Sequence, residues 1–166
     1  APAYFHRGVA RERAGDPEGA LKDFTRALEL NDRLVDARIE RAALMYRSGK
    51  FDDAARENTH ALDTDPGCAR AYAGRAMARQ AKGDWNGAWV DCTRGLEILP
   101  RFAFAYKMRG SIRLEKDDFP GALADFTQAI ELDPEASESY YFRGAARELL
   151  SAKEPGKARA HLEATM

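Results

Sequence analysis

The chain has 166 residues, of which 45% are hydrophobic and 32% charged, so it can bury a continuous core and lacks the compositional bias of a disordered segment. Its 26 Lys and Arg residues nearly balance its 27 Asp and Glu residues, which excludes a global field that would draw it to nucleic acid or to an anionic membrane. Cys68 and Cys92 lack metal-ligand spacing and no apolar run approaches roughly 18 residues, so a soluble chain is expected, with no zinc site, disulfide framework, membrane-spanning segment or uncleaved leader.

The sequence contains an internal repeat. The segment 19–32, GALKDFTRALELND, recurs at 121–134 as GALADFTQAIELDP, a shift of 102 residues or three times 34. Related segments end at Pro66 and Pro100, where a 34-residue period requires them. The sequence therefore predicts one domain over 1–166 made of the copies 1–34, 35–68, 69–102, 103–136 and 137–166. The last copy needs about two extra residues near 151–154 before Pro155 and Ala158 return to phase.

Each copy has the same internal order, which we number as positions 1 to 34 of the repeat. Small residues at positions 8, 20 and 27 allow two helices to approach closely. Position 15 is a glycine suited to a left-handed helix end, and an aspartate suited to capping the next helix follows it twice. Proline at position 32 stops the second helix. The residues at positions 15 and 32 are Gly15, Gly49 and Gly83, and Pro66, Pro100 and Pro134.

This pattern resembles the tetratricopeptide repeat (TPR), which has an aromatic residue near position 4, small residues at 8, 20 and 27, an aromatic residue at 24 and proline at 32. The likeness covers the whole chain, and four copies carry several of these markers in register. The resemblance implies an all-α fold, a right-handed α-solenoid of stacked antiparallel helix-turn-helix repeats. Departures are Arg38 at position 4, Asn58 and Cys92 at position 24, and Asp32 at position 32.

A concave groove lined chiefly by the first helix of each repeat is what the resemblance implies for function. Positions 5, 9 and 12 lie on one stripe of that helix, whereas positions 4, 8 and 11 lie on a stripe that packs inward. The first stripe is unusually apolar, so we predict a groove for an extended or helical apolar peptide. Packing of individual residues against a neighbouring repeat stays open as the alternative. The candidate groove residues are Phe5, Val9, Ile39, Tyr46, Met77, Phe104, Lys107, Ser111 and Tyr141.

Arginine occupies position 7 in all five copies and recurs at position 11 in four. Like charges at i and i+4 repel, and the acid at position 23 of the first four copies supplies a compensating charge, because positions 7 and 23 face each other in an antiparallel hairpin. We predict four structural ion pairs: Arg7 with Asp23, Arg41 with Glu57, Arg75 with Asp91, and Arg109 with Asp125. In the fifth copy an offset of two places His161 opposite Arg143. Threonine at position 25 is expected to bond back to its own helix.

No residue pattern for catalysis is found, since His6, His60 and His161 fall at unrelated positions and no Gly-rich phosphate loop occurs. The sequence predicts a non-catalytic protein–protein interaction scaffold without metal or cofactor, whose partner is a protein or peptide. Two alternatives stay open: a regulatory or interaction domain of a longer polypeptide, favoured by the start at Ala1, and a nucleic-acid or anionic-ligand binder that uses the arginines. The last copy lacks a polar capping helix, which makes it a candidate for self-association. No compartment is predicted.

Overall fold

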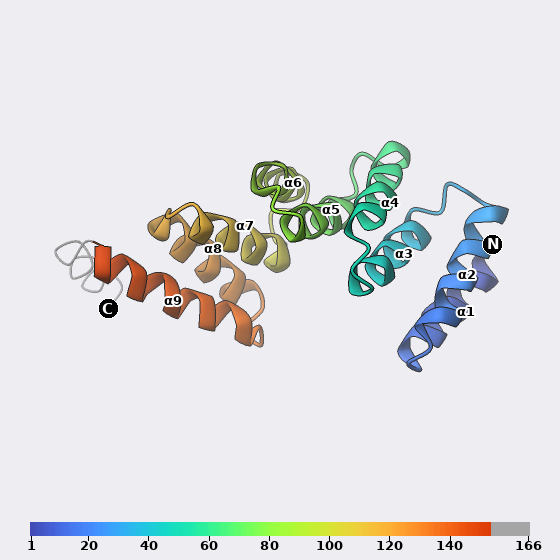
Figure 1. The fold of residues 1–166 in the computed structure, drawn as a ribbon, viewed down its shortest axis with the longest axis horizontal. Helices are drawn as coiled ribbons and strands as arrows, with labels where there is room; N and C mark the ends of the chain where they lie inside the picture. The colour runs from blue at the N-terminus through green and yellow to red at the C-terminus, as the bar shows by residue number, and fades with distance from the viewer. Residues whose placement is uncertain (154–166) are drawn as a thin grey trace. The chain divides into compact units, whose positions relative to one another are not determined.

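Helices form most of the chain that the structure describes. The structure is a computed structural model, and it describes residues 1–153. Within those residues it contains nine α-helices and no strand (Figure 1). They are α1 (Pro2–Arg13), α2 (Pro17–Leu30), α3 (Val35–Arg47), α4 (Phe51–Thr64), α5 (Ala69–Ala81), α6 (Trp85–Ile98), α7 (Ala103–Glu115), α8 (Phe119–Leu132) and α9 (Ser137–Lys153). The all-α class predicted from the sequence is confirmed.

The chain divides into two compact units. Unit 1 is Ala1–Ile98 and contains α1 to α6. Unit 2 begins at Leu99, and its described part contains α7, α8 and α9. The expectation of a single domain over 1–166 stays a prediction.

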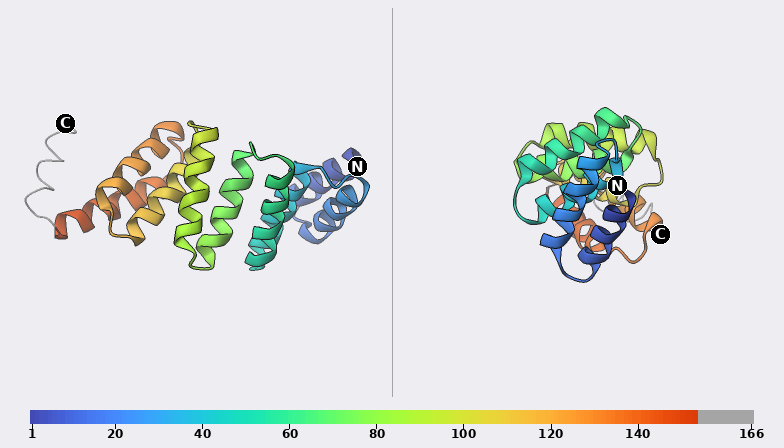
Figure 2. Two further views of the ribbon diagram at one scale, coloured as in Figure 1. Left: turned by 90° about the horizontal axis from the view of Figure 1, so that it is seen from above. Right: turned by 90° about the vertical axis from the view of Figure 1, so that its right-hand side faces the viewer.

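Successive helices pack in pairs, with one pair for each sequence repeat. In unit 1 the pairs are α1 with α2, α3 with α4 and α5 with α6, and neighbouring pairs are joined by contacts of α2 with α3 and of α4 with α5 (Figure 2). The first helices α3 and α5 also touch each other. In unit 2 α7 pairs with α8, and α8 packs against α9. The predicted helix-turn-helix repeat is therefore present in both units.

Residues with positive φ make the turns inside the hairpins. Gly15, Gly49 and Gly83 have φ angles of 81°, 74° and 79°, which would strain a residue with a side chain. In the fourth copy Asp117 takes this position with a φ of 59°, and aspartate is one of the few other residues that visit this region. The next residue caps the second helix by accepting a hydrogen bond of 2.8 to 3.0 Å from a glycine N–H in three copies: Asp16, Asp84 and Asp118.

Positions 8 and 24 set how closely the helices of a hairpin approach. Phe24 and Phe126 are fully buried, and a Cβ added to Gly8 or Gly110 would lie 2.6 or 2.9 Å from the nearest atom of the respective ring. In the second and third copies position 8 is alanine and position 24 is smaller, namely Asn58 and Cys92. A larger residue on one helix thus accompanies a smaller one on the other, which accounts for the departures from an aromatic residue at position 24.

Asn58 brings an amide group into the core of unit 1. Its side chain is 2% exposed, and its Nδ2 donates to the carbonyl of Ala54 at 2.9 Å, but Oδ1 has no hydrogen-bond partner among the described residues. A buried acceptor without a partner costs about 1–3 kcal/mol. We therefore expect Asn58→Leu, which has a similar shape, to raise the free energy of unfolding by about 1 kcal/mol in urea titrations followed by circular dichroism. Asn58→Ala, which leaves a cavity, is the control and should destabilise; a lower urea midpoint for Asn58→Leu than for wild type would contradict the prediction.

The fifth copy is described only in part. Its first helix is α9, which ends at Lys153. The second helix predicted for this copy, with Pro155, Ala158 and His161, lies outside the described residues.

Candidate functional site

The arginine at position 7 of each of the first four copies faces the acid at position 23 of the same copy. In the first hairpin Arg7 on α1 donates to both carboxylate oxygens of Asp23 on α2, at 2.7 and 2.8 Å. The contact recurs, with a shortest N···O distance of 2.7 Å each time, in the pairs Arg41–Glu57, Arg75–Asp91 and Arg109–Asp125. Such two-point, charge-assisted hydrogen bonds fix the relative position of the two helices that carry them.

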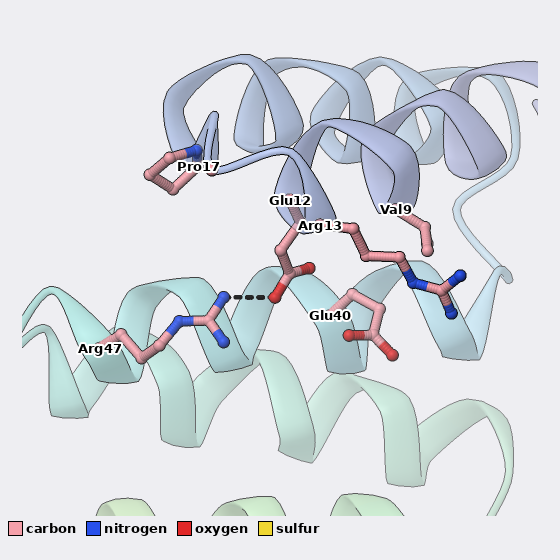
Figure 3. A pocket seen from close by; sticks show the side chains of 7 residues that line it. Val9, Glu12, Arg13, Pro17, Glu40 and Arg47 are labelled. Atoms are coloured by element: carbon pink, nitrogen blue, oxygen red, sulfur yellow. Dashed lines mark hydrogen bonds and ion pairs between the residues drawn. The ribbon is translucent and has the colours of Figure 1, made fainter.

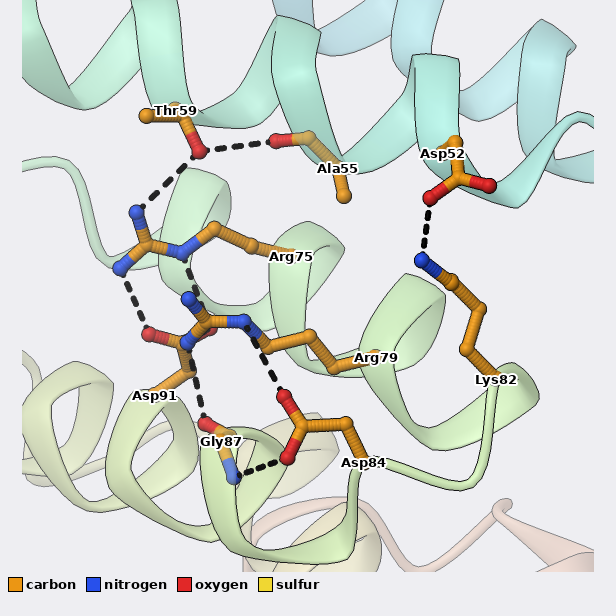
Figure 4. A network of polar contacts seen from close by, with 9 residues as sticks. All are labelled: Asp52, Ala55, Thr59, Arg75, Arg79, Lys82, Asp84, Gly87 and Asp91. Atoms are coloured by element: carbon orange, nitrogen blue, oxygen red, sulfur yellow. Dashed lines mark hydrogen bonds and ion pairs between the residues drawn. The ribbon is translucent and has the colours of Figure 1, made fainter.

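A second arginine, at position 11, forms an ion pair with the same carboxylate in three copies. Arg79 Nη1 lies 2.7 Å from Asp91 Oδ2, while Arg75 binds Oδ1 of that carboxylate (Figure 4). The three acids concerned are 1–2% exposed. We call each set of two arginines around one buried acid an arginine clamp; the clamps are Arg7, Arg11 and Asp23; Arg75, Arg79 and Asp91; Arg109, Arg113 and Asp125.

In the second copy, two arginines also surround the acid at position 23, but one of them comes from position 4 instead of position 11. Its position 11 is Met45, and its acid is Glu57, one methylene longer than aspartate. Arg38, at position 4, lies 3.6 Å from Glu57 and joins Arg41 there. The arginine that replaces the aromatic residue therefore supplies the second cation. Sequence reasoning missed this role, although the missing arginine at position 11 and the longer acid in the same copy both point to it.

In unit 1, threonine at position 25 forms two hydrogen bonds. It donates to a carbonyl of the helix that carries it and accepts from the position-7 arginine of the next repeat. Thr59 Oγ1 donates to the carbonyl of Ala55 at 2.9 Å and accepts from Arg75 Nη1 at 3.3 Å (Figure 4). Thr25 likewise accepts from Arg41 at 3.5 Å. Arg41 and Arg75 thus each bind side chains on two other helices, which supports a structural role rather than binding of external phosphate.

The electrostatics of the first clamp lead to a pH prediction. Hydrogen bonds from Arg7 are the main reason that the pKa of the Asp23 carboxyl lies below its usual value, and the charge of Arg11 lowers it further against the opposing effect of burial. A carboxyl whose pKa is lower in the folded chain stabilises the fold above its unfolded pKa of about 3.9, and this contribution is lost as the pH falls through the folded value. We expect stability to decline below about pH 4 and Asp23→Asn to flatten the decline, as measured by urea midpoints across that range. An unchanged pH dependence in Asp23→Asn would argue against this role.

The first helices of unit 1 carry most of the residues predicted for the groove. Phe5 on α1 is half-buried, and the centre of its ring lies 5.9 Å from that of Phe24. Val9 on α1, Tyr46 on α3 and Met77 on α5 are also half-buried. These four side chains therefore keep part of their surface available.

Ile39, also predicted for the groove, is buried, unlike the four residues above. It is 8% exposed and packs in the core of unit 1 with Ala61, Leu62 and Ala71. The packing alternative describes this residue better than the groove interpretation, because it offers a ligand little surface.

A hollow of about 680 Å³ lies between α1 and α3 (Figure 3). Val9 supplies an apolar wall, Arg13 and Glu40 line it with charge, and Glu12 on α1 forms an ion pair with Arg47 on α3. Within residues 1–153, no carboxylate lies at ion-pair distance from Arg13. The hollow can therefore hold an anionic group next to an apolar one.

Ion pairs between α3 and α5, the first helices of the second and third copies, make the surface that carries the predicted groove residues more polar than the sequence suggests. Arg70 on α5 lies 2.7 Å from Glu40 and 3.2 Å from Asp36, both on α3. Pairs as exposed as these contribute up to about 1 kcal/mol each. Sequence reasoning missed them because it compared residues within one copy; the signal was opposite charge at the same position of successive copies, as in Asp36 and Arg70.

In unit 2 the predicted groove residues fall on two helices. On α7, the Lys107 ammonium lies 5.2 Å from the centre of the Phe104 ring, and the Ser111 hydroxyl donates to the Lys107 carbonyl at 3.1 Å. Lys107 also forms an ion pair with Glu138 on α9, and this hydrogen bond lowers the pKa of the Glu138 carboxyl. Tyr141 on α9 is 73% exposed. Lys107 and Ser111 thus have partners within the chain, whereas most of the Tyr141 side chain is exposed and can contact a ligand.

No group of three or more His, Cys, Asp and Glu side chains within residues 1–153 could hold a metal ion. Nor does a helix in that range have the length and apolar character needed to cross a bilayer.

Comparison with protein families gives two matches. Residues 13–79 and residues 107–165 each match a family model described as tetratricopeptide repeat. Together they cover well over half of the chain. No curated protein matches it.

Similar solved structures are TPR proteins. A MamA protein aligns over 98% of this chain and 87% of its own, with a TM-score of 0.77 and 18% identity. A thermophilic TPR protein in Thermus thermophilus aligns over 92% and 82%, with a TM-score of 0.74 and 21% identity. The first TPR of Spaghetti (RPAP3), bound to the HSP90 peptide SRMEEVD, aligns over 70% and 93%, with a TM-score of 0.68 and 23% identity. At these identities the likeness concerns the fold.

Proposed function

Since the chain belongs to the tetratricopeptide repeat family, we propose that it is a non-catalytic protein-interaction scaffold that binds a peptide or protein segment along the first helices of unit 1. The TPR fold commonly serves protein interaction, and one of the similar structures holds a peptide. The partially exposed Phe5, Val9, Tyr46 and Met77 supply apolar contact on α1, α3 and α5. Phe104 and Tyr141 offer the same kind of contact in unit 2.

The observation that carries this proposal is the hollow between α1 and α3. It combines the apolar wall of Val9 with the Arg13 guanidinium, which has no carboxylate partner within residues 1–153. A peptide with an acidic side chain next to an apolar one satisfies both groups. Some members of the family grip a C-terminal carboxylate with lysine at position 5 and asparagine at position 9, but this chain has Phe5 and Val9 there, so an internal segment is the better match.

Affinity capture with variants of the full chain tests the proposal. Arg13→Glu reverses the charge in the hollow, and Tyr46→Ala/Met77→Ala removes apolar contact from the same face. The matched control is Arg33→Glu, which makes the same charge change in the exposed loop between α2 and α3. We expect wild type and the control to capture the same amount of one partner protein, as quantified by mass spectrometry. Arg13→Glu and Tyr46→Ala/Met77→Ala should each capture about tenfold less of it. Equal capture by all four chains would show that this face is not the binding surface.

A further inference from the structure

Ser139, in the first turn of α9, is a buried serine whose hydroxyl is not used by the fold. Its exposed fraction is 0%, and its Oγ has no hydrogen-bond partner within residues 1–153. The other four copies have alanine at this position, which is position 3 of the repeat. A buried hydroxyl without a partner is unfavourable, whereas alanine has no such group to satisfy. Packing alone therefore does not account for a serine in the fifth copy.

Ser139 lines a small cavity in unit 2. The cavity has a volume of about 70 Å³, and its other lining residues come from α7 and from the segment between α8 and α9: Ala103, Phe104, Lys107, Asp133 and Ala136. Asp133 is exposed and Lys107 half-buried, whereas Ser139 is buried, so the cavity extends inward from the surface. It has room for about two water molecules, at about 30 Å³ each, or for one polar group of similar size.

The second helix predicted for the fifth copy is not expected to reach this cavity. In the second and third copies position 3 is Ala37 and Ala71, and each packs against buried residues of the preceding hairpin. Neither of these clusters contains a residue of the second helix of the same copy, which is α4 or α6. The cavity likewise lies against the preceding hairpin, so the unused hydroxyl does not depend on residues after Lys153.

The polar groups around the cavity combine donors with acceptors. The Lys107 ammonium has three N–H donors, of which one is given to Glu138. The Asp133 carboxylate accepts from the Glu135 N–H at 3.3 Å through Oδ1 and has further lone pairs. The Ser139 hydroxyl can both donate and accept. A neutral group with both functions therefore matches the set, whereas a carboxylate is repelled by Asp133 and an ammonium by Lys107.

We propose that this cavity binds the carboxamide of an asparagine or glutamine side chain in a peptide partner. A carboxamide has one oxygen acceptor and two N–H donors. Its oxygen accepts from Lys107, and its N–H groups donate to Asp133 and Ser139. The half-buried Phe104 provides an apolar wall for the methylene groups that precede the carboxamide. A hydroxyl side chain, with a single polar atom, would leave part of the cavity empty.

This inference rests on the proposed role as a peptide binder, and nuclear magnetic resonance titrations of the full, isotope-labelled chain test it. The probes are glutamine and asparagine with acetyl and methylamide blocking groups; the control probes, glutamate and norleucine, have the same backbone. We expect at least one carboxamide probe to cause saturable shifts of the backbone signals of Lys107, Asp133 and Ser139, with a Kd of about 10 mM or lower. The control probes should bind about tenfold more weakly.

Ser139→Ala gives the fifth copy the residue of the other four and tests the hydroxyl itself. We expect it to weaken binding of the carboxamide probe about fivefold. Because the wild-type hydroxyl has no internal partner, the urea midpoint of this variant should equal or exceed that of wild type. The matched control is Ser48→Ala in unit 1, whose Oγ donates to the Leu44 carbonyl at 3.0 Å; it should bind the probe like wild type.

Three results would overturn the proposal. One is the absence of saturable shifts at Lys107, Asp133 and Ser139 with both carboxamide probes up to about 100 mM. Another is binding of the glutamate probe at least as tightly, which would assign the cavity to a carboxylate. A third is unchanged affinity in Ser139→Ala, or a lower urea midpoint, which would mean that the hydroxyl serves the fold. These signals come from unit 2, whereas affinity capture tests the surface on α1, α3 and α5, so the failure of one proposal is distinguishable from that of the other.

Discussion

Asp91→Ala is expected to lower the free energy of unfolding by about 4 kcal/mol. The Asp91 carboxylate is 1% exposed and accepts hydrogen bonds from Arg75 and Arg79 at 2.7 to 2.9 Å. Its removal leaves two neighbouring guanidinium groups without their shared counter-charge in a partly buried site, where breaking an ion pair costs far more than at the surface. Urea denaturation followed by circular dichroism measures the loss.

The matched control is Asp52→Ala, since Asp52 forms an ion pair with Lys82 but its side chain is 73% exposed. That change should cost less than about 1 kcal/mol. A similar loss in both variants would mean that the clamp contributes no more than a surface pair. If, in addition, Arg75→Ala abolished binding of an oligonucleotide, the anionic-ligand interpretation of the arginines would replace the structural one.

The features that the sequence predicted well depend on geometry inside one hairpin. The 34-residue period and the glycines at position 15 identify two helices and a tight turn, and an antiparallel hairpin leaves little choice about which positions face each other. Opposite charge at positions 7 and 23 could therefore be matched without a structure, and Arg7 lies against Asp23. The match between residue sizes at positions 8 and 24 was not predicted, although the sequence pairs Gly8 with Phe24 and Gly110 with Phe126.

The features that escaped prediction depend on geometry between hairpins. Helical spacing places Ile39 and Tyr46 on one stripe of α3, but Ile39 is buried against α4 and against Ala71 on α5, whereas Tyr46 stays half-exposed. The ion pair of Arg70 with Glu40 joins helices of consecutive copies, and the period alone does not give their register. The charge on the candidate binding face was underestimated for this reason.

Gly110→Leu is expected to lower the free energy of unfolding by about 3 kcal/mol. Gly110 is buried on α7, and even a Cβ there would lie 2.9 to 3.1 Å from three atoms of the Phe126 ring. Phe126 is fully buried and cannot move aside without disturbing the packing of α8, because protein cores are close-packed. Thermal and urea unfolding followed by circular dichroism measure the effect.

Gly144→Leu, the same substitution at the same position of the next copy, separates this steric effect from the change in helix propensity. Leucine favours the helix over glycine by about 0.8 kcal/mol, and a Cβ on Gly144 would meet no atom of residues 1–153 within 4 Å. Gly144→Leu should therefore leave stability unchanged or raise it slightly. Equal destabilisation by both substitutions would mean that Gly144 is covered as Gly110 is. A large loss for Gly110→Leu alone would show that Gly110 is required for the close approach of α7 and α8.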